Sequence, residues 1–205
     1  MIVLRAGWVV PVDRTPLRDA AVAVEDGRVR WVGPAAEAPS GEVRDLGAGV
    51  LLPGLVNAHC HLELSHLAGR LADANGFVDW VERLVAARAQ DAPDVVRRRA
   101  SAGIQELEDT GTAAVGDVSN ALAHLDLLGR STLRARVFFE LIGWDPEAAG
   151  RVIEDARARL AAIAPADGVT VSLAAHAPHS VSPALLAAMA DARLILRDGR
   201  VVEHV

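Results

Sequence analysis

Apolar and polar residues follow two different patterns along this chain, and the pattern changes near residue 53. Before that point, short apolar runs are separated by turn-forming pairs such as Asp26-Gly27 and Gly33-Pro34. An Asp-Gly pair between two apolar runs is typical of a tight β-hairpin. Residues 1–52 are therefore predicted to form a small β domain. Its strands are expected at 2–12, 20–25, 28–33 and 43–46.

Beyond residue 53, near-continuous apolar runs alternate with segments whose apolar residues recur every three or four positions. The runs have the length of buried strands, and the segments between them have the period of amphipathic helices. This alternation is typical of parallel βα units, and four units are predicted over residues 53–190. The strands are expected at 55–61, 112–118, 136–141 and 169–176, and the helices at 77–90, 93–111, 122–128, 145–163 and 185–189.

The last residues return to the first pattern. Asp198-Gly199 lies between two short apolar runs, so residues 191–205 are predicted to form a hairpin.

Two histidines stand out within the first predicted strand of the βα region. Pro53-Gly54 predicts a turn, and the extended segment after it has side chains that alternate between its two faces. His59 and His61 are therefore expected to point the same way. Two imidazoles separated by about 6–7 Å along a strand can share one divalent ion, although catalytic zinc usually takes three protein ligands. The alternative is a pair of partly buried strand histidines without a metal.

Composition narrows the classes of partner. The chain has 205 residues, 51% hydrophobic content and a net charge of −6, without a basic run. This balance argues against nucleic acid or an anionic membrane as a partner, and it favours a small-molecule substrate.

Cys60 is the only cysteine, which excludes an intramolecular disulfide. The first residues lack the features of a signal peptide, and no apolar run has membrane-spanning length, so a cytoplasmic protein is expected.

Two phrases give the chain a family resemblance. Pro-Gly-Leu-Val-Asn-Ala-His-Cys-His-Leu-Glu at 53–63 and Ala-His-Ala-Pro-His-Ser-Val-Ser-Pro at 175–183 resemble the metal-dependent amidohydrolase superfamily. The similar branch contains base, nucleoside and aminofutalosine deaminases and triazine hydrolases. The resemblance implies a TIM-type (β/α)₈ barrel with a small β domain to which the terminal hairpin returns. The expected fold is thus α/β: a small β-sandwich-like domain (1–52 with 191–205) and a half barrel (53–190).

The resemblance also implies roles for individual residues. It makes His59 and His61 ligands of one divalent ion, Zn or Fe, and His176 a substrate contact. Active sites of such barrels lie at the carboxyl ends of the strands, where Asp117 and Glu140 are also expected. Glu63 follows the first strand and is a further candidate for substrate binding. For both strand-end carboxylates the alternative is a structural hydrogen-bond acceptor, and for Glu63 it is a solvated carboxylate.

Several family features have no match. A complete barrel takes about 250 residues, and only about 140 lie between Pro53 and the terminal hairpin. The resembled deaminases carry a third metal histidine and a proton-shuttling glutamate on the fifth strand, a histidine on the sixth and an aspartate on the eighth. None of these motifs is present, so no catalytic acid or base is assigned. The sequence also has no lysine to be carboxylated, which implies a mononuclear site.

Two functions remain open at this point. The first is hydrolysis of a non-peptide C–N bond, such as deamination of an aminated ring or a nucleoside-like molecule, impaired in this short form. The second is an inactive half-barrel remnant or binding module. A cytidine-deaminase zinc site is excluded because Pro-Cys-x-x-Cys is absent. Four parallel strands would leave two unpaired edges, which predicts self-association into a homo-oligomer.

Overall fold

The computed structural model describes residues 1–164, 166–190, 194–197 and 200–204, the last two ranges as backbone only. The chain divides into two compact units, Met1–Gly54 and Leu55–Val205. None of the described helices is long and apolar enough to cross a membrane.

The first unit is a β-sheet with the strand order β3-β2-β1-β4, in which β5 also pairs with β1. The strands are β1 (Ile2–Val9), β2 (Leu17–Glu25), β3 (Arg28–Pro34), β4 (Glu42–Asp45) and β5 (Val50–Leu51), and a 3₁₀ turn, η1, covers Ala35–Glu37. Asp26 and Gly27 both have positive φ, 51° and 69°, which suits the tight turn of an antiparallel hairpin. The predicted β2–β3 hairpin is confirmed.

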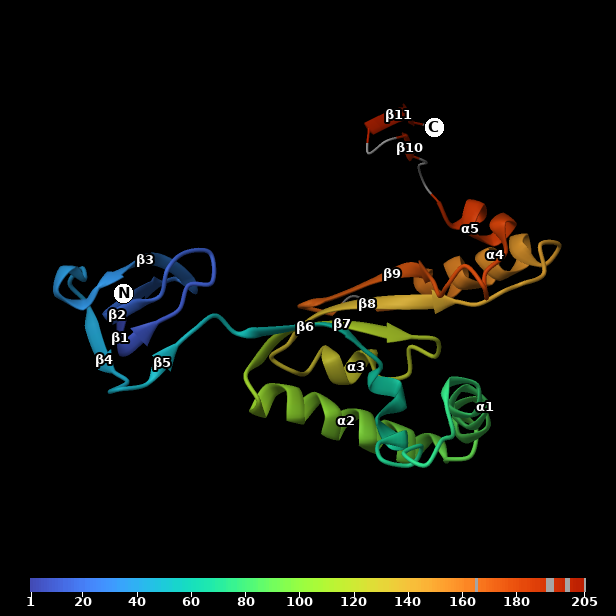
Figure 1. The fold of residues 1–205 in the computed structure, drawn as a ribbon, viewed down its shortest axis with the longest axis horizontal. Coiled ribbons are helices and arrows are strands. Elements are labelled where there is room, and N and C mark those ends of the chain that lie inside the picture. The colour runs from blue at the N-terminus through green and yellow to red at the C-terminus, as the bar shows by residue number, and fades with distance from the viewer. Residues whose placement is uncertain (165, 191–193, 198–199, 205) are drawn as a thin grey trace. The chain divides into compact units, whose positions relative to one another are not determined.

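The second unit contains four parallel strands in the order β6-β7-β8-β9 (Figure 1). They are β6 (Leu55–Cys60), β7 (Thr112–Ser119), β8 (Arg134–Leu141) and β9 (Val169–Ala175). The prediction of an α/β fold with four parallel βα units is therefore confirmed. Because all four strands run the same way, their carboxyl ends lie along one edge of the sheet.

Helices follow each of these strands. They are η2 (Leu62–Leu67), α1 (Phe77–Arg88), α2 (Pro93–Asp109), α3 (Leu125–Leu128), α4 (Ala149–Ala161) and α5 (Pro183–Met189). Ser182 caps α5 by accepting a hydrogen bond from Leu185 N at 3.2 Å. The helix expected from residue 145 begins only at Ala149, because Asp145 instead accepts a hydrogen bond from Glu147 N in a turn.

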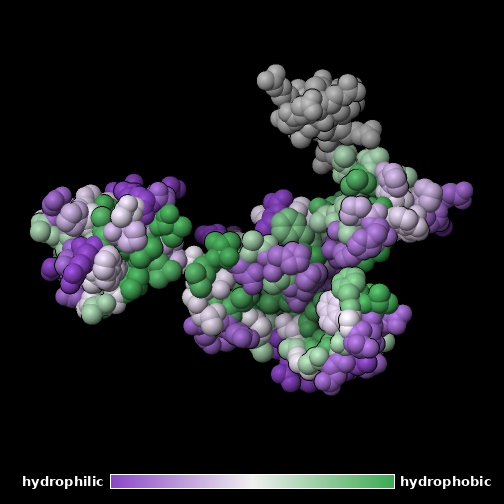
Figure 2. Space-filling model, viewed as in Figure 1, coloured by the Kyte–Doolittle hydropathy of each residue, from purple (hydrophilic) through white to green (hydrophobic). Residues whose placement is uncertain are grey.

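The helices cover one face of the sheet. Along β8, Ala135, Val137, Phe139 and Leu141 are buried beneath them, whereas Arg134 and Arg136 on the opposite face are exposed. One core lies beneath α2 and α3, and a second lies between β8, α4 and α5. We call the other side of β6–β9 the open face. Figure 2 shows apolar residues next to hydrophilic ones on the visible surface, so burial of apolar side chains is incomplete in this chain.

The terminal hairpin consists of β10 (Leu194–Arg197) and β11 (Arg200–His204), which pair antiparallel with each other. Its return to the small β domain stays a prediction. The Asp198-Gly199 turn lies outside the described residues.

Replacing Leu128 by alanine should destabilise the second unit strongly. Leu128 is fully buried in the core beneath α2 and α3, and truncating such a leucine typically costs about 2–5 kcal/mol of unfolding free energy. Leu186 on α5 is 56% exposed, so Leu186→Ala is a matched control that should cost less than about 1 kcal/mol. Urea unfolding measures the free energy of unfolding of both variants. Equal losses in Leu128→Ala and Leu186→Ala would contradict the assignment of the core.

Candidate active site

The carboxyl ends of β6–β9 bring most of the predicted site residues to one edge of the sheet. His61 follows β6, Asp117 lies near the end of β7, Glu140 lies near the end of β8, and His176 follows β9. Glu63 lies in η2, directly after β6. The prediction that these residues gather at the strand ends agrees with this placement, but their individual roles depend on their contacts.

A bulge in β6 determines where its two histidines lie. Asn57 pairs with Val115 and Cys60 pairs with Asp117, so two residues of β6, Ala58 and His59, oppose the single residue Gly116 of β7. Such a bulge re-aims the side chains that follow it. Cys60 packs against the core on the helix side, whereas His59 is exposed.

The rings of His59 and His61 lie edge to face, with centroids 5.2 Å apart and planes at 75°. This contact agrees with the expectation that both side chains point the same way.

Gly116 allows β6 and β7 to approach closely at the bulge. A Cβ atom at this position would lie 2.4 Å from the carbonyl oxygen of Ala58. No side chain fits at that distance, so any other residue would push the bulged segment away from β7. The position of His59 therefore depends on a glycine in the neighbouring strand.

Asp117 anchors the chain at the end of β6. Its side chain is fully buried and accepts a hydrogen bond from Leu62 N at 2.8 Å, and His124 Nε2 lies 2.7 Å from its other oxygen. Because a carboxylate oxygen accepts, His124 Nε2 is the protonated ring nitrogen here. The Cys60 thiol lies 3.7 Å from the same carboxylate. Burial, together with this negative charge, raises the pKa of Cys60 to about 12, so the thiol stays neutral.

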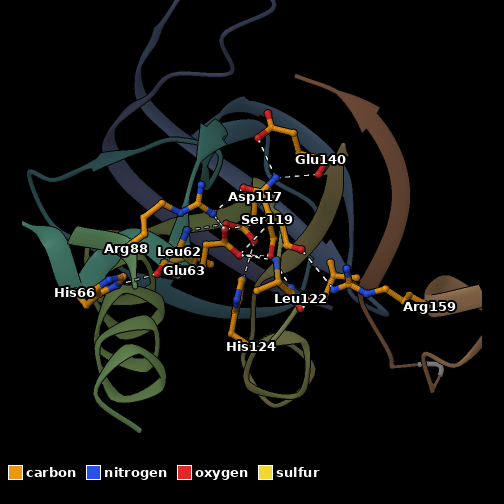
Figure 3. A network of polar contacts seen from close by, with 12 residues as sticks. Leu62, Glu63, His66, Arg88, Asp117, Ser119, Leu122, His124, Glu140 and Arg159 are labelled. Atoms are coloured by element: carbon orange, nitrogen blue, oxygen red, sulfur yellow. Dashed lines mark hydrogen bonds and ion pairs between the residues drawn. The ribbon is translucent and has the colours of Figure 1, made fainter. Parts of the chain in front are cut away.

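Glu63 anchors the next segment in the same way (Figure 3). It is 5% exposed and accepts hydrogen bonds from Ser119 Oγ (2.6 Å), from the amides of Asn120 and Ala121 (3.1 and 3.0 Å) and from Arg88 (2.9 Å). Burial alone would raise its pKa, but these hydrogen bonds and the Arg88 guanidinium outweigh it and hold the pKa of Glu63 below its ordinary value. Glu63 is thus an ionised, internally paired carboxylate, in contrast to the solvated alternative.

Asn120 connects this network to β8. It accepts a hydrogen bond from Arg88 at 2.8 Å, and its amide nitrogen donates to the backbone oxygen of Glu140 at 2.8 Å and to the Glu140 side chain at 3.3 Å. Arg159 of α4 donates to the carbonyl of Ala121 at 3.2 Å and lies over the Phe139 ring, 4.5 Å from its centroid. Sequence reasoning missed these residues. The only signal was the polar Ser119-Asn120 pair directly after a buried strand.

His176 lies apart from this network. Its Nδ1 is 2.6 Å from Ser180 Oγ, and its ring contacts that of His179 with centroids 5.8 Å apart. Among the described residues, no hydrogen bond or ion pair joins His176 to His59, His61 or Glu140. The substrate-binding roles of His176, Glu63, Glu140 and Asp117 stay predictions. For Asp117 and Glu63 the contacts above point to positioning of the backbone.

The histidine side chains could supply part of the ligands of a metal site. His59 and His61 are close enough for both imidazoles to reach one ion. The part of the chain that the structure describes contains no group of three or more His, Cys, Asp or Glu side chains arranged to hold a metal. The described residues therefore fit two positions of a divalent ion and fall short of the three protein ligands usual for catalytic zinc.

Removal of the Asp117 carboxylate should destabilise the second unit severely. Asp117→Ala leaves Leu62 N and His124 Nε2 buried without their acceptor, and breaking a buried pair in this way costs ~3–5 kcal/mol of unfolding free energy. Asp126→Ala is the control, because Asp126 is exposed and its pairs with Arg97 and Arg130 lie at the surface, where an ion pair is worth ~0–1 kcal/mol. Urea unfolding measures the free energy of unfolding of both variants. If Asp117→Ala lost no more of it than Asp126→Ala, the anchoring role of Asp117 would be contradicted.

Curated relatives share this sequence over most of its length. The 5-methylthioadenosine/S-adenosylhomocysteine deaminase of Desulfovibrio desulfuricans is 33% identical in an alignment 192 residues long that covers 87% of this chain and 42% of the relative. The protein of the same name from Nitratidesulfovibrio vulgaris strain DP4 is 31% identical over 92% of this chain and 45% of its own length. The chain therefore spans less than half the length of these relatives.

Solved structures show the same fold. Aminofutalosine deaminase of Helicobacter pylori, in complex with methylthio-coformycin, superposes with a TM-score of 0.76 at 24% identity and covers 92% of this chain and 47% of that protein. Atrazine chlorohydrolase of Arthrobacter aurescens TC1, complexed with zinc, gives a TM-score of 0.75 at 18% identity, covering 92% of this chain and 49% of the other. These similarities confirm the partial-barrel fold class.

A sequence profile of the amidohydrolase family matches residues 50–197, which include all four parallel strands and both histidine phrases. The chain belongs to the amidohydrolase family.

Proposed function

We propose that the chain supplies one half of an amidohydrolase active site that hydrolyses a non-peptide C–N bond. The reaction class is deamination of an aminated ring or a nucleoside-like small molecule. The observation that carries this proposal is the pair of neighbouring imidazoles, His59 and His61, at the carboxyl end of the first parallel strand. The relatives named as deaminases support the reaction class.

His59 and His61 would hold one divalent ion, Zn or Fe, and the remaining ligands would come from outside the described residues. The zinc in the related chlorohydrolase structure supports a metal of this kind. When bound, such an ion supplies a water molecule whose pKa is lowered toward ~7. The protein side of this arrangement is already ordered: the bulge at Ala58-His59 and the anchored amide of Leu62 fix the backbone on both sides of the histidine pair.

Two other residues have proposed contacts with the substrate, and two more act behind them. Glu140 would accept a hydrogen bond from an amino group on the substrate, because Asn120 already orients its side chain. His176 would contact the substrate from the end of β9, with Ser180 fixing its ring through Nδ1. Glu63 and Asp117 act behind these groups, as positioning residues that hold the segments after β6 and β7 in place.

The alternative function is a half barrel without its own catalysis, either a remnant or a binding module. The observation in its favour is that, among the described residues, no third donor joins His59 and His61 in a group that could hold a metal. Both functions predict some affinity for metal at His59 and His61. They differ in turnover.

Zinc titration followed calorimetrically tests the shared part of both functions. We expect the 205-residue chain to bind one Zn²⁺, and His59→Ala or His61→Ala to weaken binding by about 100-fold or more, because even outer-shell changes cost ~10–100-fold. His179→Ala removes an exposed histidine that is not a proposed ligand, and it should bind zinc like the unchanged chain. Unaltered affinity in His59→Ala and His61→Ala would remove the basis of the proposal.

Ammonia release in the same samples tests whether the chain is an inactive remnant. With two ligands and no identified proton shuttle, we expect turnover on aminated purines, pyrimidines, triazines and nucleosides to stay at background, since a positioned acid–base group alone contributes ~10²–10⁴ in rate. Metal-dependent release that disappears in His59→Ala would show a site completed by further residues, and it would rule out the inactive remnant.

A further inference from the structure

The turn directly before α1 contains the pair Asn75-Gly76, and both residues are exposed. Gly76 is the N-cap of α1 and has a positive φ of 88°, and a Cβ atom built on it would meet no other atom within 4 Å. Asparagine is one of the chemically labile residues of proteins, and exposed turns of small polar residues are the most accessible places for a reaction. Of the three asparagines in the sequence, Asn75 is the one that glycine follows.

Two groups at this turn are free to react with each other. Among the described residues, neither the side-chain amide of Asn75 nor the backbone nitrogen of Gly76 has a hydrogen-bond partner. The Asn75 side chain can therefore rotate until its Cγ atom faces the Gly76 nitrogen. Glycine permits this approach because it has no Cβ atom and few restrictions on its backbone angles.

The other two asparagines lack this freedom. The side chain of Asn120 forms three hydrogen bonds, and the nitrogen that follows it, Ala121 N, donates to Glu63 at 3.0 Å. Asn57 lies in β6, where its Oδ1 accepts a hydrogen bond from His59 N at 3.2 Å. Alanine follows both asparagines, and its Cβ atom hinders the approach of a side chain to the backbone nitrogen.

We propose that Asn75 is a site of spontaneous deamidation and isomerisation. The Gly76 nitrogen loses its proton to hydroxide and attacks Cγ of Asn75, which closes a five-membered succinimide ring. The Cγ–Nδ2 bond breaks, and Nδ2 takes a proton from water and leaves as ammonia. Water then opens the ring. Cleavage between Gly76 N and Cγ gives aspartate, whereas cleavage between Gly76 N and the carbonyl carbon of residue 75 gives isoaspartate, whose main chain runs through the former side chain.

Isoaspartate would change the start of α1. Hydrogen bonds from Arg83 at 2.8 Å and from Asn75 N at 2.7 Å hold the pKa of Asp79, in the first turn, below its ordinary value. Because Gly76 has no side chain to cap the helix, the contact between Asn75 N and Asp79 closes this end of α1. Isoaspartate adds an atom to the main chain after Asn75 N and displaces that nitrogen from Asp79. The buried residue of α1, Ala87, lies near the opposite end, so the first turn should fray.

Peptide mapping follows each asparagine separately. Cleavage after arginine places Asn57, Asn75 and Asn120 in three different peptides, 45–70, 71–83 and 100–130. When the folded chain is kept in mildly alkaline buffer, we expect peptide 71–83 to gain one mass unit and to separate into an aspartate and an isoaspartate form. The rate should rise with pH, because hydroxide removes the proton from the attacking nitrogen. The other two peptides should keep their mass over the same period.

Unfolding in guanidinium chloride separates the effect of the fold from that of the sequence. There we expect the rate at Asn75 to change little, because the fold already leaves it open, and the rate at Asn120 to rise. Asn75→Gln is the matched control. It keeps an exposed amide, but its ring would have six members and close more slowly, so peptide 71–83 should keep its mass.

Hydrogen exchange tests the consequence for α1. The isoaspartate form should lose protection at Trp80 N, which donates to Gly76 O at 3.0 Å, whereas Asn75→Asp has an ordinary main chain and should keep it. Equal protection in both would overturn the proposed effect on the helix. The proposed site itself is overturned if peptide 71–83 of the folded chain keeps its mass, if folding slows the reaction at Asn75 as much as at Asn120, or if the mass increase persists in Asn75→Gln.

Discussion

Two carboxylates without access to water determine the local structure at the carboxyl edge of the sheet. Asp117 and Glu63 are both buried, and a buried carboxylate is tolerated only when hydrogen bonds and opposite charges replace its hydration. Each one finds its partners on a different strand connection: Asp117 of β7 binds the amide of Leu62 after β6, and Glu63 after β6 binds the amides of Asn120 and Ala121 after β7. Hydrogen bonds thus hold the two connections together in both directions. Loss of either carboxylate would leave backbone amides of the other connection without an acceptor.

This reciprocal pairing explains why a two-histidine pair can be ordered with only half of a barrel around it. The bulge at Ala58-His59 places the first histidine, and Gly116 gives that bulge the room it needs. The anchored Leu62 amide then fixes the backbone directly after His61. Arg88 from α1 and Arg159 from α4 extend the same network outward, so both helices contribute to the order of the strand ends (Figure 3).

The sequence predicted the elements of this fold better than it predicted the contacts of the site. Strand and helix order follow from local periodicity, and the last helix, expected at 185–189, is observed at Pro183–Met189. The start expected at Asp145 for the fourth helix is wrong because aspartate also stabilises turns, and the local sequence does not distinguish a helix start from a turn. The β6 bulge depends on the pairing with β7, and the pairs of Asp117 with His124 and of Glu63 with Ser119 depend on which strands become neighbours. Such contacts carry no periodic signature.

We propose that the anchored bulge presents His59 and His61 as a single two-nitrogen ligand. Pulsed electron paramagnetic resonance of the chain loaded with one equivalent of Cu²⁺ tests it most directly, because the nuclear modulation counts the imidazoles bound to the ion. We expect modulation from two imidazoles in the unchanged chain and from one in either His59→Ala or His61→Ala. Modulation from a single imidazole in the unchanged chain, or two that persist in both variants, would contradict it.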